Sequence, residues 1–201
     1  MDYKTIANDG IVEEEIKKSR FICHLKRISS EEEGREYIAQ IKKEHHKANH
    51  SCSAMIVGDD GQIKRSSDDG EPSGTAGVPM LTVLEKQGLT NVVAVVIRYF
   101  GGIKLGTSGL IVAYKAAAAE AISAATIIEK TVDEDVTVMF EYPFMNDVMR
   151  IVKEEEPEIL NQSYDMDCSM TLRIRCSMMP KLRARLEKVE TARILDDENI
   201  L

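Results

Sequence analysis

The most distinctive hydrophobic pattern lies near the middle of the chain, where a strand, a glycine-rich loop and a helix follow one another. Residues 91–100, NVVAVVIRYF, form a nearly continuous apolar run of the kind found in strands buried on both faces. Four glycines follow within nine residues. Residues 107–125 are rich in alanine, which predicts a strong helix with Thr107 or Ser108 as its N-cap.

Shorter patterns before this segment predict a mixture of strands, helices and turns. A serine followed by helical apolar spacing is typical of a helix start, and glycines between two apolar runs favour a hairpin. In chain order, the expected elements are a strand or strand pair at 14–28, a helix at about 30–45, a hairpin at 51–66 around the turn Gly58–Gly61, a Gly- and Pro-rich loop at 68–79, and a short helix at 80–88.

A second complete set of elements follows residue 131. It reads as a strand at 136–142, a helix at 144–155, strands at 159–166 and 168–176, a helix at 180–190 and a short strand at 192–195. This order is the split β-α-β pattern of a ferredoxin-like fold. We therefore expect an α+β protein with two domains, 1–130 and 131–201, joined near the polar, acidic stretch 127–134.

Composition and charge narrow the class of protein. No stretch of the 201 residues is long and apolar enough to span a membrane, and the four cysteines are scattered, so we expect a cytoplasmic protein with reduced thiols. The net charge of −8 argues against broad affinity for nucleic acid. Residues 1–131 carry 17 Lys and Arg against 18 Asp and Glu, whereas the remainder carries 9 against 16, so a polyanion would meet the first part of the chain.

The glycine-rich loop is the first candidate site. A helix that begins directly after it presents unpaired backbone N–H groups, which attract anions, and two basic side chains lie nearby. The loop is not a P-loop, because Thr107 stands where that motif needs lysine. A purely structural turn is the alternative, but we favour an anion or nucleic-acid site. Its expected residues are Arg98, Gly101, Gly102, Lys104, Gly106, Thr107 and Ser108.

The loop at 68–79 is a second candidate whose role the sequence leaves uncertain. Asp68, Asp69 and Glu71 lie within four residues and could bind Mg²⁺, but such sites usually gather carboxylates from separate elements. A solvated acidic turn is the favoured interpretation. The other members of this candidate loop are Ser73, Gly74 and Thr75, and the sequence around Ser73 is not a nucleophile elbow.

His45, His46, His50 and Cys52 are the residues with the best metal-ligand chemistry. They do not form a compact set of four ligands, so we expect no zinc, and we assign no metal, cofactor or catalytic residue. His50 is the best candidate for proton transfer by residue type, although a lone histidine of this kind is more often structural.

Four segments together resemble the Impact/YigZ family. They are KKSRFI at 17–22, the A-x-H-x-C-x-A spacing at 48–54, SDDGEPSGTAGVPML at 67–81 and RYFGGIKLGTSGL at 98–110. The resemblance implies a first domain similar to domain 2 of ribosomal protein S5 and a second, ferredoxin-like domain similar to the last domain of elongation factor G. It also implies a link to translation, because eukaryotic members of this family regulate translation under amino-acid stress by binding proteins.

These observations leave three functions open. The favoured one is a non-enzymatic, translation-associated regulator that binds RNA, the ribosome or a translation-regulatory protein through the glycine-rich loop. The second is an enzyme that binds a phosphorylated small molecule with a carboxylate-held metal. The third is a protein-interaction module in which both loops are only structural. The oligomeric state is not predicted.

Overall fold

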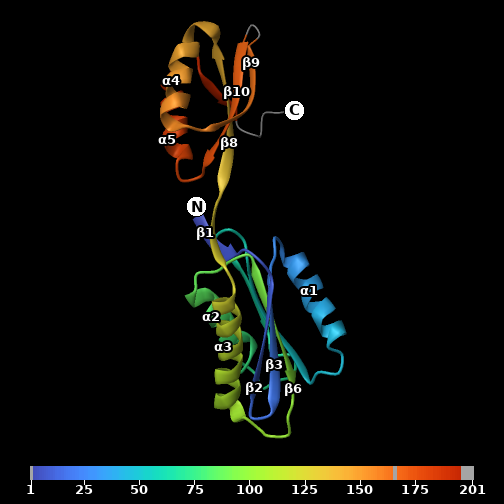
Figure 1. The fold of residues 1–201 in the computed structure, drawn as a ribbon. Coiled ribbons are helices and arrows are strands. Elements are labelled where there is room, and N and C mark those ends of the chain that lie inside the picture. Colours follow the sequence, from blue (N-terminus) through green and yellow to red (C-terminus); the bar gives the residue numbers. More distant parts are fainter. Residues whose placement is uncertain (1, 165–166, 196–201) are drawn as a thin grey trace. The chain divides into compact units, whose positions relative to one another are not determined.

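A computed structural model describes residues 2–164 and 167–195, which fold as two compact units (Figure 1). The first unit comprises Asp2–Lys130, and the second begins at Thr131. Both units combine helices with antiparallel sheet, so the predicted α+β fold class is confirmed.

The first unit is built on a five-stranded antiparallel sheet. Its strands, in spatial order, are β2 (Gly10–Ile16), β3 (Ser19–Arg27), β6 (Val92–Tyr99), β4 (His50–Val57) and β5 (Ile63–Ser67). The central strand β6 is apolar along its length because both of its faces are covered. Val92, Ala94 and Val96 pack toward α2 and α3, whereas Val93 and Val95 pack on the α1 side. Figure 1 shows α1 on one face of this sheet and α2 and α3 on the other.

The three helices of this unit begin in three different ways. Helix α1 (Glu31–Glu44) starts as predicted, because the Ser30 hydroxyl accepts the Glu33 N–H at 3.1 Å. Helix α2 (Gly77–Lys86) begins three residues before its predicted start, because the Asp68 carboxylate accepts the N–H groups of Ala76 and Gly77. A side chain distant in sequence therefore supplies the cap that α2 lacks locally.

Helix α3 (Gly106–Ala124) corrects a prediction. Neither Thr107 nor Ser108 is its N-cap, because Gly106 has a φ of +74° and turns the chain directly into the helix. Both residues therefore lie inside the first turn, and Leu105, whose side chain makes no capping hydrogen bond, occupies the cap position.

The stretch at 127–134 is also different from the prediction. It forms strand β7 (Ile127–Thr131) and the start of β8 (Asp133–Glu141) rather than an irregular linker, and only Val132 separates the two strands. Strand β7 pairs with β1 (Asp2–Ile6), which the sequence patterns did not predict. Because its backbone belongs to paired strands, this stretch is less open to proteolysis than a loop would be.

The second unit has the predicted ferredoxin-like order. Its elements are β8, the short 3₁₀ turn η1 (Tyr142–Phe144), α4 (Met145–Glu155), β9 (Glu158–Tyr164), β10 (Asp167–Arg175), α5 (Met179–Leu186) and β11 (Arg193–Leu195). The spatial strand order is β11-β8-β10-β9, and all pairs are antiparallel. Both helices pack on one face of this sheet over a core that includes Val138, Met170 and Leu182 (Figure 1).

Candidate anion-binding pocket

The two candidate loops meet at one end of the five-stranded sheet and enclose a pocket of about 390 Å³. They meet there because His50 at the start of β4 is paired with Arg98 at the end of β6, which brings the segments that flank these strands together. The residues that line the pocket are Asn49, His50, Glu71, Pro72, Arg98, Phe100, Lys104, Leu105, Gly106, Thr107 and Leu110.

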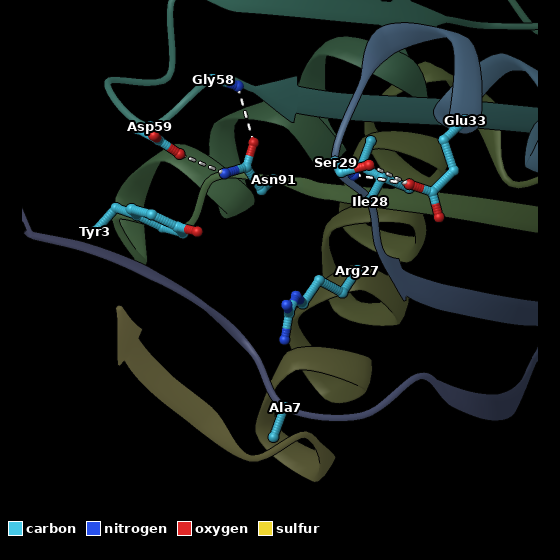
Figure 2. A pocket seen from close by; sticks show the side chains of 9 residues that line it. All are labelled: Tyr3, Ala7, Arg27, Ile28, Ser29, Glu33, Gly58, Asp59 and Asn91. Carbon is cyan, nitrogen blue, oxygen red and sulfur yellow. Dashed lines mark hydrogen bonds between the residues drawn. The ribbon is translucent and has the colours of Figure 1, made fainter. Parts of the chain in front are cut away.

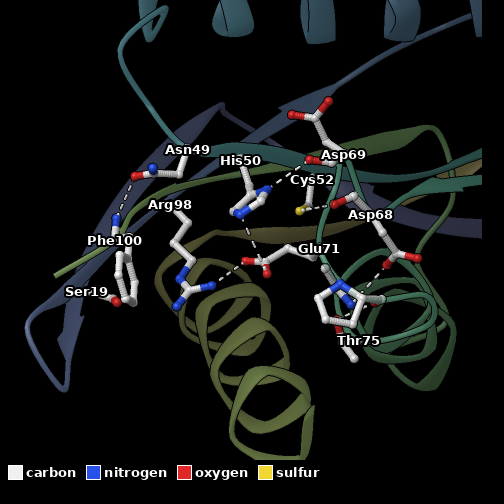
Figure 3. Close-up of polar contacts among 12 residues, drawn as sticks. Ser19, Asn49, His50, Cys52, Asp68, Asp69, Glu71, Thr75, Arg98 and Phe100 are labelled. Atoms are coloured by element: carbon white, nitrogen blue, oxygen red, sulfur yellow. Dashed lines mark hydrogen bonds and ion pairs between the residues drawn. The ribbon is translucent and has the colours of Figure 1, made fainter. Parts of the chain in front are cut away.

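Glu71 is the centre of the polar network in this pocket. It is 8% exposed, and its Oε1 accepts hydrogen bonds from Nη1 of Arg98 at 2.6 Å and from the hydroxyl of Tyr114 at 2.7 Å. Its Oε2 lies 3.7 Å from Nε2 of His50. Figure 3 shows the side chains of His50, Glu71 and Arg98 pointing toward one another above α3. A buried carboxylate is tolerated here because several donors share it.

Arg98 lies in the wall of the pocket rather than projecting from the end of its strand. It is 5% exposed, and its guanidinium lies 5.6 Å from the ring centre of Phe21 and 5.5 Å from that of Phe100. Nη1 is bonded to Glu71, but the buried Nε has no hydrogen-bond partner among the described residues. Arg98 therefore keeps an unused donor at a site where a buried unpaired donor is costly.

His50 has one ring nitrogen fixed by the protein. Its Nδ1 lies 2.9 Å from the carbonyl oxygen of Asp69. Since a carbonyl only accepts hydrogen bonds, Nδ1 carries the hydrogen, and in the neutral ring Nε2 is left with a lone pair on the side of Glu71. The imidazole thus presents Nε2 toward the pocket in a defined orientation.

Tyr114 and Cys52 extend the network into the core, where burial disfavours the ionised form of both side chains. Burial raises the pKa of the Tyr114 hydroxyl far above its ordinary value, and burial raises the pKa of the Cys52 thiol to about 12. The Cys52 thiol lies 3.0 Å from the carbonyl oxygen of Asp68. A thiol with such a pKa is protonated at neutral pH and is a poor nucleophile.

The loop at 68–79, called the acidic loop below, is neither a solvated turn nor a cluster of free carboxylates. The Asp68 carboxylate accepts the N–H groups of Gly74, Ala76 and Gly77 at 2.8–3.0 Å. Burial alone would raise the pKa of Asp68, but these backbone donors together hold it below its ordinary value. The Asp69 carboxylate accepts the Ser51 N–H at 2.7 Å and pairs with Lys42. The interpretation as a solvated turn was therefore wrong, because both aspartate carboxylates accept hydrogen bonds from backbone N–H groups of the protein.

The remaining residues of this loop shape the backbone. The Thr75 hydroxyl donates to the carbonyl of Pro72 at 2.6 Å, and Thr75 is buried. Gly74 has a φ of +75°, a conformation that favours glycine. Ser73 is exposed and does not line the pocket. Only Glu71 and Pro72 of this loop face the pocket.

The glycines of the other loop have different roles. A Cβ on Gly101 would lie 1.9 Å from the carbonyl oxygen of Lys18, so Gly101 allows the loop to pack against the β2–β3 turn. Gly102 has a φ of +87° and open space around it, and Gly106 turns the chain into α3. Lys104, Gly106 and Thr107 line the pocket, whereas Ser108 does not.

His45, His46, His50 and Cys52, the residues with metal-ligand chemistry that were not expected to hold zinc, have separate roles where the structure describes their contacts. Nδ1 of His45 lies 2.9 Å from the Tyr99 hydroxyl, whereas His50 and Cys52 contact backbone carbonyls of the acidic loop. Across residues 2–164 and 167–195, no three His, Cys, Asp or Glu side chains are arranged to hold a metal ion.

A second pocket, of about 630 Å³, lies at the opposite end of the same strands (Figure 2). Its polar groups are largely paired with one another. Nδ2 of Asn91 donates to Asp59 at 3.1 Å, its Oδ1 accepts the Gly58 N–H, and Glu33 accepts the N–H and hydroxyl of Ser29. Although this pocket is larger, its groups serve turns and a helix start, so we favour the pocket at Glu71 as the functional site.

The chemistry of the pocket at Glu71 suits an anion. Two cations, Arg98 and Lys104, line it together with one carboxylate, Glu71, and the uncapped N-terminus of α3 adds partial positive charge from its N–H groups. The sequence pointed to the cations and the helix start. It did not identify Tyr114 or the central position of Glu71, because these contacts join residues from separate elements.

Comparison with known proteins gives the class of the chain. Residues 17–122, which include every element of the pocket, match the model of the Impact N-terminal domain. The chain is 45% identical over 154 residues to the IMPACT family member YvyE of Bacillus subtilis, which covers 77% of this chain and 71% of the relative. It is 36% identical over 177 residues to the IMPACT family member YigZ of Escherichia coli, covering 87% of each.

A solved structure, described as the crystal structure of a hypothetical protein, is similar over 98% of both chains, with 33% identity and a TM-score of 0.69. The chain belongs to the IMPACT family, and the predicted resemblance is confirmed. Among the described residues, no helix combines the length and the apolar character needed to cross a membrane.

Proposed function

We propose that this chain is a non-enzymatic, translation-associated protein that binds phosphate groups of RNA in the pocket between Glu71, Arg98 and α3. The observation that carries the proposal is that the N-terminus of α3, whose N-cap side chain makes no capping hydrogen bond, lines one pocket together with the cationic side chains of Arg98 and Lys104. Helix N-termini with a nearby Lys or Arg are favourable sites for phosphate.

The link to translation comes from the family. Membership of the IMPACT family, with the Impact N-terminal domain matched at 17–122, supports the role in translation that the family resemblance implies. The distribution of charge favours contact with a few RNA phosphates over broad binding of nucleic acid, because residues 1–131 are close to neutral although the whole chain carries −8. One positive pocket on a near-neutral unit suffices for phosphate contacts.

Salt-dependent co-sedimentation with ribosomes and with purified ribosomal RNA tests this proposal. Lys104→Ala should weaken binding at low salt and lower the slope of log affinity against log salt by about one, because one phosphate contact is lost. Lys115→Ala removes the same charge from an exposed position of α3 outside the pocket and serves as the matched control. Equal effects of the two variants would contradict the pocket as the contact site.

An enzyme that acts on a phosphorylated small molecule is the second candidate. The fixed orientation of His50 favours it, because Nε2 faces a concave pocket that has room for more than a phosphate group. The version with a carboxylate-held metal loses support, since Asp68 and Asp69 are engaged by backbone N–H groups. Loss of turnover in His50→Gln with phosphate binding retained would favour the enzyme.

The third function, a protein-interaction module, predicts a different result. Partner binding would then be insensitive to Lys104→Ala and to salt, because neither loop would contact a charged ligand.

A further inference from the structure

The rim of the pocket carries an aromatic ring next to the cationic groups. Phe100 lines the pocket and is 44% exposed, although it is a large apolar side chain. The Arg98 guanidinium lies 5.5 Å from its ring centre, and the Phe100 N–H donates to Oδ1 of Asn49 at 2.8 Å. The backbone at Phe100 is therefore anchored while much of the ring remains open to a ligand. Figure 3 shows Asn49, Arg98 and Phe100 together at this edge of the pocket.

The volume and lining of the pocket exceed what a phosphate group needs. A pocket of about 390 Å³ lies within the range of roughly 300 to 1,000 Å³ that is usual for small-molecule sites. Besides its charged groups it is lined by the apolar residues Pro72, Leu105 and Leu110. A ligand that fills it must join an anionic group to a larger part that is flat or apolar.

We infer that the pocket binds a nucleotide, with its phosphate at the start of α3 and Lys104 and its base stacked on Phe100. This inference rests on the proposed anion site and adds the class of ligand. A nucleobase fits because its flat face stacks on an aromatic ring, whereas a sugar phosphate gains nothing comparable from the exposed ring. A single ring accommodates one base, which agrees with the absence of Trp and the presence of only four Phe in the chain.

Calorimetric titration of the full chain with three probes tests the inference. The probes are inorganic phosphate, ribose 5-phosphate and adenosine 5′-monophosphate. The nucleotide should bind at least roughly tenfold more tightly than ribose 5-phosphate, because only the nucleotide stacks on Phe100. Equal affinities for these two probes in the wild-type protein would overturn the inference while leaving the anion site intact.

Variants of Phe100 test whether its ring causes the difference in affinity between the nucleotide and ribose 5-phosphate. Phe100→Leu should remove the roughly tenfold preference and leave the affinity for ribose 5-phosphate within about twofold of wild type, whereas Phe100→Tyr should keep the preference. Ile103→Ala is the matched control, because Ile103 is 42% exposed in the same loop but does not line the pocket. Thermal unfolding checks that each variant is folded. If folded Phe100→Leu keeps the preference, the base does not stack there and the inference fails.

Further experiments distinguish a free nucleotide from the end of an RNA chain as the ligand. They also test the nucleotide inference separately from the anion site on which it rests. A six-residue oligoribonucleotide with a 5′-phosphate that binds more tightly than the mononucleotide, and that loses affinity in Phe100→Leu, identifies an RNA end as the source. If the oligoribonucleotide and the mononucleotide bind with equal affinity, the ligand is a free nucleotide. Insensitivity of ribose 5-phosphate to Lys104→Ala would contradict the anion site itself. Failure of every probe to bind overturns the inference, and the co-sedimentation assay then decides the RNA proposal separately.

Discussion

The Glu71 carboxylate and the Arg98 guanidinium meet at 2.6 Å, and their side chains are only 3% and 6% exposed. Glu71 belongs to the acidic loop, whereas Arg98 lies near the end of β6, the strand that leads into the glycine-rich loop. The ion pair therefore joins the two loops that form the pocket. Burial of such a pair is costly unless both partners keep further contacts, and here Tyr114 and the rings of Phe21 and Phe100 supply them.

Breaking this pair should strongly destabilise the first unit. Glu71→Gln keeps the size of the side chain but leaves the buried charge of Arg98 uncompensated, so we expect a loss of about 3 kcal/mol or more in urea unfolding. Glu13→Gln is the control, because its 2.7 Å pair with Arg20 is about half exposed and should matter far less. A similar loss in both variants would show that the burial of the pair is unimportant.

Asp68 should control the path of the acidic loop. Asp68→Asn replaces an acceptor of three backbone N–H groups by a group with only one acceptor oxygen, so we expect a loss of stability of about 2 kcal/mol. Asp60→Asn, at an exposed turn where Asp60 accepts the Gln62 N–H at 3.2 Å, is the control. A stable Asp68→Asn protein with unchanged phosphate binding would contradict this role.

The same residue predicts a pH effect with a definite sign. The folded-state pKa of Asp68 is lowered, so its contribution to stability is present above the unfolded pKa, about 4, and is lost as pH falls through the folded value. Unfolding titrations between pH 6 and pH 2 should therefore show a smaller loss of stability in Asp68→Asn than in the wild type.

The local patterns predicted most of the fold because each element carries its own signal. Ser30 caps α1, and the apolar run of β6 is buried on both faces. Strands β1 and β7 were missed because they are short, partly polar and paired with each other from opposite ends of the first unit. The uncapped start of α3 was missed because the φ of Gly106, rather than the nearby hydroxyls, sets it.

The candidate site was predicted in its residue types but not in their roles. Asp68, Asp69 and Glu71 are near neighbours in sequence, yet their carboxylates face different partners because the loop path turns each side chain separately. Tyr114 bonds to Glu71 across 43 residues only because α3 packs on the sheet. Contacts of this kind depend on tertiary structure, and a single sequence has no local signal for them.

The glycine-rich loop should respond unequally to alanine at its first two glycines. Gly101→Ala places a Cβ 1.9 Å from the Lys18 carbonyl oxygen, so the loop must move, at a cost of about 3 kcal/mol. A Cβ at Gly102 meets open space, so Gly102→Ala should lower the free energy of unfolding by only about 1 kcal/mol. This loss arises because alanine is strained at a φ of +87°. Urea unfolding compares the two, and equal losses would contradict the packing role of Gly101.

His24 should make the first unit less stable at mildly acidic pH. It is 4% exposed, neither ring nitrogen has a partner among the described residues, and the His45 ring lies 5.3 Å away. Burial, followed by the charge of His45, lowers its pKa, although Glu44 opposes this shift. Above the unfolded pKa, about 6.5, the ring is neutral and there is no cost of charging it; as pH falls from there through the lower folded value, the folded protein loses stability relative to the unfolded chain.

His24→Leu tests this assignment. The variant should lose the decline in stability between pH 7 and pH 5 and gain about 1 kcal/mol at pH 7, because two buried ring nitrogens without partners are removed. His46→Gln changes an exposed histidine of the same region and should leave the pH profile as in the wild type. An unchanged decline in His24→Leu would assign the pH dependence to another group.

The most direct test of the anion site is a titration of the ¹⁵N-labelled full chain with inorganic phosphate and with a 5′-phosphorylated oligoribonucleotide, followed by NMR. The amides of Gly106 and Thr107 and the Nε–H of Arg98 should shift in a saturable manner, because these three residues line the pocket and report on a ligand that occupies it. The start of α1, which Ser30 caps, is the internal control and should not respond. Shifts at α1 equal to those at α3, or no saturable shift at Gly106, Thr107 and Arg98, would contradict the account.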